Sequence, residues 1–298
     1  MMIDFKNIEI KDREWIDEKL RESDFRGCEY SFVNNFIWQK PYEIKYANIN
    51  DFYCIRGGDK NSVYAYPAGK GDIKPVIEIL IKEAKEKGEK FKLRGITLEN
   101  IEKLNELFPN KFDFEPKRDE FDYVYEVSKL STLSGRKLHG KRNHIARFKD
   151  NPDWSYEPIT EKNIDECFKM NNEWCSRYNC IEDESLNHEL CAVKEAFKNF
   201  FDLKMLGGLI RREGKIVGYT MASHLNSDTL DVNIEKAFPE IQGAYPMINQ
   251  QFVLNECQNF KYVNREEDVG DEGLRKAKLS YVPDILLEKY TATLKEEK

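Results

Sequence analysis

Long apolar runs, paired cysteines and clustered histidines are all absent from this sequence of 298 residues. No stretch approaches the roughly 18 to 20 apolar residues that cross a bilayer, and the N-terminus carries charges where a signal peptide would be apolar. No two cysteines form a C-x-x-C pair, and no histidines lie at zinc-ligand spacing. We therefore expect a soluble, cytoplasmic protein with no membrane span and no metal site.

Signatures of nucleotide cofactors and of a thiol nucleophile are missing as well. The sequence contains neither a P-loop nor a dinucleotide fingerprint. The cysteines read as reduced thiols that mostly pack in the core, and no histidine neighbours any of them in a way that would activate a nucleophile. They are Cys28, Cys54, Cys167, Cys175, Cys180, Cys191 and Cys257. The four histidines (His139, His144, His188 and His224) are isolated, and we interpret them as structural or solvated.

The overall charge also limits the possible partners. A formal net charge of -7 and a pI near 5.4 argue against general, sequence-blind nucleic-acid binding, which normally accompanies a basic domain. A local basic patch stays possible. Hydrophobic residues make up 40% of the chain and aromatic residues 12%, which excludes disorder, and the length suits about two domains.

Hydrophobic periodicity predicts the same order of elements twice. In the first half, a helix within 31–42 precedes three short strands (42–49, 51–58 and 62–69) that should form an antiparallel meander. A helix over 72–89, a strand at 91–96, a helix over 97–109 with Thr97 as N-cap and a strand within 121–130 follow. In the second half we predict helices in 160–179 and 184–203, two strands in 206–225, a strand at 229–237, a helix within 243–260, a strand at 261–268, a short helix at 272–280 and one final strand at 285–294.

This repetition predicts a mixed α/β (α+β) protein built from two copies of one fold. Each copy should have a mixed, mostly antiparallel sheet flanked by helices. We place the N-terminal domain at 1–130, a basic linker helix at 131–150 and the C-terminal domain at 151–298.

The linker carries an uninterrupted run of positive charge. Its basic residues are Arg136, Lys137, Lys141, Arg142, Arg147 and Lys149, and no acid occurs before Asp150. On a helical projection Leu138, Ile145 and Phe148 share one side, which predicts a helix with a packed face and a basic edge. This edge is either a solvated interdomain surface or a surface that faces phosphates.

Three segments together resemble a known family. They are "SFVNNFIW" (with Asn34, Asn35 and Trp38), "LHGKRNHIARF" in the linker, and the charged tail "NREEDVGDEGLRKAKLSYVP". In this order they are similar to the soluble family related to the C-terminal domain of phosphatidylglycerol lysyltransferases. The resemblance implies two tandem GNAT-like acyltransferase domains, the arrangement also found in Fem-family enzymes that use aminoacyl-tRNA.

The GNAT resemblance allows a test of the CoA site. Enzymes of this fold that use acetyl-CoA have a Q/R-x-x-G-x-G/A loop whose backbone N–H groups hold the pyrophosphate. The matching segment here has Gly243, but Glu240 stands at the first position and Tyr245 at the last, and Pro246 lacks an N–H. We therefore expect no CoA cofactor, although acyl-CoA and aminoacyl-tRNA both stay open as donor substrates.

The charged tail supplies the candidate site. Acyl transfer needs a base near a carbonyl and donors for the developing oxyanion. We assign Glu267 and Asp268 as candidate catalytic residues. Candidate substrate-binding residues are Asn264, Glu266, Arg275, Lys278 and Tyr281, together with Lys141, Arg142 and Asn143 of the linker. The alternative is an ordinary charged surface in which Asp271 pairs with Arg275 and Glu272 with Lys276 at helical spacing.

The resulting functional hypothesis is an aminoacyltransferase or acyltransferase of the GNAT superfamily whose donor and acceptor are not fixed by the sequence. Its substrates would be a small molecule or an aminoacyl-tRNA. The alternative from a different class is a non-catalytic double-GNAT module that binds an amino acid, a peptide or RNA. Fold resemblance alone does not decide between the two.

Overall fold

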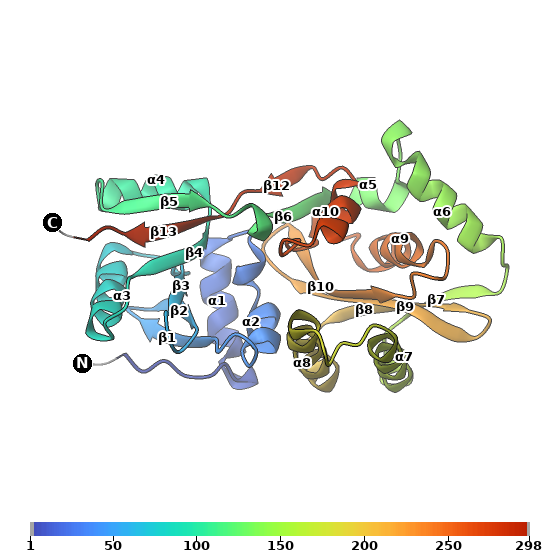
Figure 1. Ribbon diagram of the computed structural model, residues 1–298, viewed down its shortest axis with the longest axis horizontal. Coiled ribbons are helices and arrows are strands. Elements are labelled where there is room, and N and C mark those ends of the chain that lie inside the picture. The colour runs from blue at the N-terminus through green and yellow to red at the C-terminus, as the bar shows by residue number, and fades with distance from the viewer. Residues whose placement is uncertain (1–2, 297–298) are drawn as a thin grey trace.

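The computed structural model describes residues 3–296, in which two sheets lie end to end along the molecule (Figure 1). The helices are α1 (Arg13–Ser23), α2 (Phe32–Trp38), α3 (Lys74–Glu86), α4 (Leu98–Leu107), α5 (Val127–Thr132), α6 (His139–Lys149), α7 (Ile164–Arg177), α8 (Glu184–Asn199), α9 (Ala244–Glu256) and α10 (Glu272–Leu279). Short 3-10 helices are η1 (Ile10–Asp12), η2 (Cys28–Tyr30), η3 (Arg118–Glu120) and η4 (Arg136–Leu138).

The strands divide between the two sheets. They are β1 (Lys45–Ile49), β2 (Phe52–Gly57), β3 (Val63–Ala65), β4 (Lys92–Ile96), β5 (Phe112–Pro116), β6 (Asp122–Glu126), β7 (Trp154–Pro158), β8 (Leu206–Arg212), β9 (Lys215–His224), β10 (Thr229–Ala237), β11 (Tyr262–Asn264), β12 (Ile285–Leu287) and β13 (Tyr290–Leu294). The first sheet has the order β1-β2-β3-β4-β13-β5 and the second β12-β6-β11-β10-β9-β8-β7. The predicted meander of β1, β2 and β3 is confirmed.

Most predicted elements form because local signals agree with the hydrophobic pattern. The hydroxyl of Ser31 accepts from the Asn34 N–H at the start of α2, and Thr97 begins α4 with a capping box, as predicted. The two strands predicted in 206–225 are also present as β8 and β9, joined by a tight turn with Arg212 opposite Lys215. The pattern did not predict α1, β5 or β7, and residues 127–130, predicted as the end of a strand, form the start of α5.

The linker is helical over part of its predicted range. After α5 the backbone turns at Leu133 (φ 48°), and η4 leads into α6. Leu138, Ile145 and Phe148 are buried, as the projection predicts, and α6 packs against α9.

The predicted final strand at 285–294 is wrong as a single element. It is two strands, separated by Glu288 and Lys289, that belong to different sheets. β12 pairs with β6 in the second sheet, whereas β13 lies between β4 and β5 in the first. The prediction failed because the two segments are short and are separated only by Glu288 and the buried Lys289. A local sequence pattern does not show that the chain passes from one sheet to the other between them.

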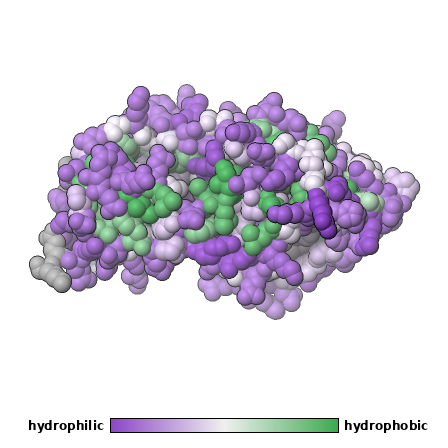
Figure 2. All heavy atoms as spheres, turned by 90° about the horizontal axis from the view of Figure 1, so that it is seen from above, coloured by the Kyte–Doolittle hydropathy of each residue, from purple (hydrophilic) through white to green (hydrophobic). Residues whose placement is uncertain are grey.

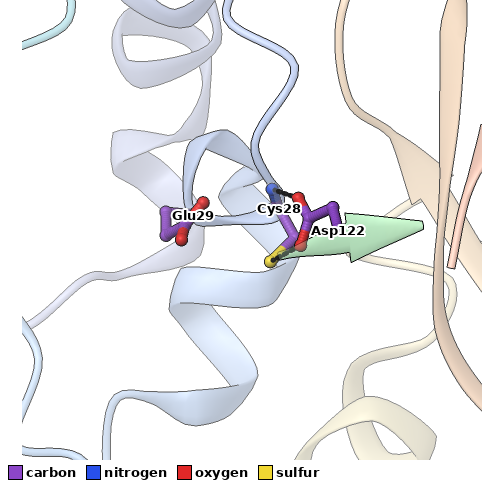
Figure 3. A group of neighbouring side chains, drawn as sticks. All are labelled: Cys28, Glu29 and Asp122. Atoms are coloured by element: carbon purple, nitrogen blue, oxygen red, sulfur yellow. Dashed lines mark hydrogen bonds between the residues drawn. The ribbon is translucent and has the colours of Figure 1, made fainter. Parts of the chain in front are cut away.

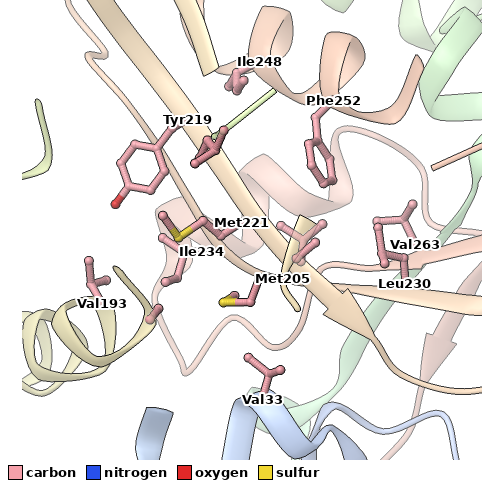
Figure 4. Close-up of a cluster of buried hydrophobic side chains, with 14 of the residues drawn as sticks. Val33, Val193, Met205, Tyr219, Met221, Leu230, Ile234, Ile248, Phe252 and Val263 are labelled. Carbon is pink, nitrogen blue, oxygen red and sulfur yellow. The ribbon is translucent and has the colours of Figure 1, made fainter. Parts of the chain in front are cut away.

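Each sheet therefore contains a strand from the other half of the sequence. β6 precedes the linker but lies between β12 and β11 of the second sheet, and β13 ends the chain but completes the first sheet. The main core is continuous across the junction. Figure 4 shows Val33 of α2 facing the side of the second sheet where Met205 and Val193 lie. A second core fills the space between the first sheet and α3 and α4.

The surface is strongly polar. Charged residues make up 34% of the chain. In the view from above, hydrophilic side chains predominate and separate several groups of apolar ones (Figure 2). Within residues 3–296, no helix combines the length and apolar character of a membrane span.

The exchange of strands leads to a prediction about the two sequence halves. The boundaries at residues 130 and 150 stay a prediction, and we propose that the halves depend on each other to fold. A fragment of residues 1–150 lacks β13, and one of residues 151–298 lacks β6, so each leaves a gap inside a sheet. We expect neither fragment to unfold cooperatively alone, and the equimolar mixture to regain a cooperative thermal transition by circular dichroism. A sharp transition of either isolated fragment would contradict this.

Candidate functional site

The candidate site lies where β10 and β11 separate. These parallel neighbours pair only from Thr229 to Asp231 on β10, and β10 then continues through residues 232–237 without β11. After β11 the chain turns toward β6, because the Arg265 N–H donates to the Tyr123 carbonyl at 2.9 Å. An ion pair of 2.8 Å between Arg265 and Glu235 spans the opening. The charged tail found in the sequence thus follows directly on a splayed pair of strands.

The loop after β11 is conformationally strained. Glu266 and Val269 have left-handed backbones, with φ of 56° and 47°, and Val269 is β-branched. The buried ammonium of Lys278 donates to the carbonyl of Arg265 at 2.6 Å and to that of Glu267. Strain of this kind persists only where surrounding contacts fix it, and it is common at functional sites.

Asp268 anchors this loop through cations. It is fully buried, and its carboxylate contacts Arg275 at 2.7 Å and Arg118 at 3.1 Å and accepts from the Tyr123 hydroxyl at 2.6 Å. Burial alone would raise the pKa of Asp268, but the hydrogen bonds from Arg275 and Tyr123 outweigh it and hold that pKa below its ordinary value. The carboxylate stays charged and its oxygens are occupied, which favours an anchoring role over that of a base.

Arg275 does not pair with Asp271 as the surface alternative predicts. Its guanidinium binds Asp268 and, at 2.6 Å, Asp119. Asp271 instead caps α10 by accepting from the Leu274 N–H. The alternative reading of this pair is therefore wrong, since the arginine binds a buried acid N-terminal to the helix.

Glu267 belongs to a buried cluster that the sequence did not predict. Its carboxylate lies 3.4 Å from the ammonium of Lys289 and accepts from the thiol of Cys28 at 3.4 Å. Lys289 is fully buried and also binds Glu29 at 2.6 Å and Asp122 at 2.7 Å. Burial opposes the charge on Lys289, yet Asp122, Cys28 and Glu29 raise its pKa well above the ordinary value. The lysine therefore stays an ammonium inside the protein.

Three members of this cluster also have the donors of a metal site. Figure 3 shows Cys28, Glu29 and Asp122 converging, and their ligand atoms lie within 4.8 Å of one another. Burial, and next the Asp122 carboxylate, raise the pKa of the Cys28 thiol well above its usual range. Because the Lys289 ammonium binds both carboxylates, a metal ion would have to displace it. The donor set is thus satisfied by an internal cation.

Five carboxyls gather around β11. We call the carboxyls of Glu29, Asp122, Asp231, Glu266 and Glu267 the acid cluster; the ammonium groups of Lys278 and Lys289 lie among them, and the guanidinium groups of Arg94 and Arg265 lie beside them. One oxygen each of Glu29, Asp231 and Glu266 is buried without a hydrogen-bond partner. Burial is the main cause that raises the pKa of Glu29 to about 7 and those of Asp231 and Glu266 well above normal.

Asn264 connects the acid cluster to the loop. Its amide donates to Asp122 at 2.9 Å and to the Arg26 carbonyl at 3.0 Å, while its oxygen accepts from the Glu266 N–H at 2.7 Å. The arrangement as a whole can accept protons or a positively charged group, because it holds more carboxyls than internal cations.

The linker residues divide into two groups. Lys141 reaches the site, with its ammonium 4.0 Å from the centroid of the buried Tyr281 ring. Arg142 donates to the carbonyls of Leu133 and Gly135, and the Asn143 amide lies 3.2 Å from the His139 ring nitrogen. The structure therefore brings Lys141 to the site but not Arg142 or Asn143, and these last two substrate-binding assignments are not supported by their contacts.

The loop before α9 is poorly formed for a pyrophosphate. Gly243 has φ 85°, and a Cβ there would lie 2.1 Å from the His144 carbonyl oxygen. The backbone of α6 therefore packs closely against this loop. The Ala244 N–H already donates to Ile241, and Glu240 is paired with Arg177. A hollow of about 700 Å³ lies elsewhere, lined mainly by residues 7–11 and by residues 36–45 of α2 and the segment after it. Buried charge rather than cavity volume therefore marks the site.

A splayed pair of parallel strands in a mixed, mostly antiparallel sheet defines the class of GNAT-like proteins. The sequence matches the family "Phosphatidylglycerol lysyltransferase, C-terminal" over residues 20–293, and the chain belongs to this family. Its resemblance to that family and its fold class are thereby confirmed.

Solved structures agree with this assignment. A conserved protein of unknown function from Bacteroides thetaiotaomicron is 41% identical, with a TM-score of 0.94, covering 99% of this chain and 100% of that one. The C-terminal domain of a putative lysylphosphatidylglycerol synthetase from Agrobacterium fabrum has a TM-score of 0.67 at 11% identity, covering 96% and 93%. L-PGS from Bacillus licheniformis has a TM-score of 0.67 at 15% identity, covering 100% and 95%. The last two likenesses show the fold alone.

The sequence is also similar to an uncharacterized protein of Mycoplasmoides gallisepticum, to which it is 26% identical over 204 residues. The match covers 66% of this chain and 62% of that relative, so the chain spans less than two thirds of its length.

The buried lysine gives a testable prediction for stability. Lys289→Met should cost about 3 to 5 kcal/mol in the free energy of unfolding, because it leaves Asp122 and Glu29 buried without their cation. Urea denaturation of the purified protein measures this loss. Lys295→Met is the matched control, since Lys295 contacts Asp113 at the surface and such pairs contribute less than about 1 kcal/mol. Equal losses in the free energy of unfolding for the two substitutions would show that the ion pairs of Lys289 do not stabilise the fold more than a surface pair does.

Proposed function

We propose that the chain transfers an aminoacyl or acyl group from a donor other than CoA to an amine or hydroxyl acceptor at the opening between β10 and β11. The excess of buried carboxyls at this opening carries the proposal. An aminoacyl donor brings an ammonium group that would favour the ionised form of these buried carboxyls, whose pKa values burial raises, and transfer needs a base for the attacking nucleophile.

The roles of the residues follow from their surroundings. Glu267 is the candidate base, because it is part of the acid cluster and its side chain is 24% exposed, so a nucleophile can reach it. Glu266 would hold the donor's ammonium, because one of its oxygens has no partner, and Asn264 would position Glu266 by accepting from its N–H. Asp268, Arg275 and Lys278 would hold the loop in its strained shape. Tyr281 and Lys141 would line the opposite side.

The family name suggests which donor to test first. Lysyl transfer appears in the names of the matched family and of a solved relative, and a lysyl group carries two ammonium groups that suit an acid-rich site. Aminoacyl-tRNA is the donor class implied by the resemblance. The backbone of α6 lies close to the loop at Gly243, and this close approach disfavours CoA at that loop.

A binding module without turnover is the second candidate. It is favoured by Asp268 and Lys289, because their charges are already satisfied within the protein. Incubation with a panel of radiolabelled aminoacyl-tRNAs and with acyl-CoA, with loss of label from the donor as readout, separates the two. Binding without any loss of label beyond spontaneous hydrolysis would favour the module.

Glu267→Gln tests the proposed base and ligand site. The substitution keeps the shape and removes the charge, so it should leave the melting temperature near that of the wild type but abolish stabilisation by a ligand. The ligands are amino-acid amides, stable analogues of the aminoacyl ester, and a ligand at about a hundred times its Kd stabilises by roughly 2.7 kcal/mol. Glu272→Gln, an exposed acid of α10, is the control. Equal ligand shifts in wild type and Glu267→Gln would place the site elsewhere.

The basic edge of α6 tests the tRNA donor. Arg147 is exposed and makes no ion pair among residues 3–296, so Arg147→Ala should lower the slope of log K against log salt by about one phosphate contact, roughly 0.9. Filter binding of tRNA over a salt series measures the slope. Lys85→Ala on α3 is an exposed control that should leave the slope unchanged. A slope that neither substitution alters would leave α6 as a solvated helix.

A further inference from the structure

Lys141 is a cation without a counter-ion. It projects from α6, is half-buried, and makes no hydrogen bond or ion pair with any residue between 3 and 296. Its ammonium lies over the Tyr281 ring, 4.0 Å from the ring centroid. A buried ammonium group normally finds a carboxylate or carbonyl, so its solitary state indicates that a partner is missing.

A second cation lies on the same ring. The guanidinium of Arg265 is 4.9 Å from the centroid of Tyr281 and pairs with Glu235 at 2.8 Å. Its Nη1 is buried and has no hydrogen-bond partner. Two cations therefore contact one aromatic ring, and only Arg265 has a carboxylate partner, which leaves the Lys141 charge unpaired and the Arg265 Nη1 without a hydrogen bond.

The electrostatics of Lys141 agree with this geometry. Burial first, and next the charge of Arg265, lower the pKa of Lys141 to about 8, against the opposing effect of Glu235. The charged or titratable groups that face it are thus Arg265 from the loop after β11, Glu235 from β10, and Tyr281 after α10. A bound anion would offset the repulsion between the two cations and favour the protonated amine.

We propose that Lys141 and the free Nη1 of Arg265, beside Tyr281, bind an oxyanion, a phosphate or carboxylate group. Binding of the anion then favours the protonated Lys141 amine. No bond is made or broken in this step; a proton moves from solvent to the Lys141 amine. Because Arg265 is next to Glu266, the opening between β10 and β11 then has a cationic side facing its acid-rich side. A substrate with an ammonium at one end and an oxyanion at the other fits both.

This inference deepens the proposed function and rests on it for the role of the anion, but its test needs no turnover. The probe is inorganic sulfate, whose charge does not change between pH 7 and pH 9. Isothermal titration calorimetry should show a tenfold weaker affinity at pH 9 than at pH 7, since the protonated fraction of Lys141 falls about tenfold over this range. At pH 8, buffers with different ionisation enthalpies should report proton uptake. An affinity that is independent of pH would overturn the coupling.

Three variants of cationic residues make the test specific. Lys141→Met keeps the aliphatic stem and should weaken sulfate binding at pH 7 at least tenfold. Lys141→Arg keeps the charge at every pH used, so it should bind within about threefold of wild type at pH 7 and lose the decline toward pH 9. Lys137→Met, an exposed lysine one turn before Lys141, is the matched control and should change nothing. Equal weakening by Lys137→Met and Lys141→Met would reduce the site to a diffuse basic surface.

Arg265 requires a paired substitution. Arg265→Met alone would leave Glu235 buried without its cation and destabilise the fold, so Arg265→Met is combined with Glu235→Gln. The double variant should lose sulfate binding at least tenfold while retaining a cooperative melt. Wild-type affinity in this folded double variant would overturn the role of Arg265.

Two further ligands identify the source of the oxyanion. Adenosine 5′-monophosphate that competes with sulfate, while acetate does not, would assign the site to a phosphate; competition by acetate alone would assign it to a carboxylate. Failure of both and of sulfate overturns the proposal. If sulfate binds as expected but no donor is consumed, the anion site is supported and the transferase proposal fails. If a donor is consumed but sulfate does not bind, the transferase proposal is supported and the anion site fails.

Discussion

The fold depends most on a buried ion pair network around Lys289. This ammonium contacts Asp122 from β6 and Glu29 from η2, and it lies 3.4 Å from Glu267 in the loop after β11. Lys289 itself stands at the point where the chain leaves the second sheet and enters the first. A charge inside a protein is costly unless its partners are fixed, so four segments far apart in the sequence must meet in one arrangement. The candidate base Glu267 is positioned by the same requirement.

Periodicity and turn residues were sufficient for most of the fold. The meander of β1 to β3, α3, α4 and the strands β8 to β10 follow from local patterns that the core reinforces. The exchange of β6 and β13 could not be read locally, because nothing within 285–294 states that its two apolar parts pair with different sheets. A charged residue in the middle of an apolar run was the available signal, and Lys289 proves to be the residue at the crossing.

The site was predictable only in part, for a related reason. The segment from Asn264 to Tyr281 is rich in charged residues, which made it a candidate site. The structure places Asn264, Glu266, Glu267 and Lys278 together at the end of β11. Their partners Glu29, Asp122 and Lys289 are distant in sequence, so no spacing rule connects them. Arg142 was predicted at the site but does not lie there. Its charge and its position on the linker helix indicated substrate binding, but its guanidinium donates to the carbonyls of Leu133 and Gly135, which the turn before α6 leaves free.

The position of β13 has a consequence for how the chain can be made. Residues 290–294 form an interior strand of a sheet whose other strands lie before residue 117. During synthesis from the N-terminus, β4 and β5 have emerged from the ribosome long before their common neighbour, so their facing edges wait for more than half of the translation of the chain. Until then those edges are open to pairing with other strands, and a chaperone that shields exposed strand edges would be most useful to this protein during that interval.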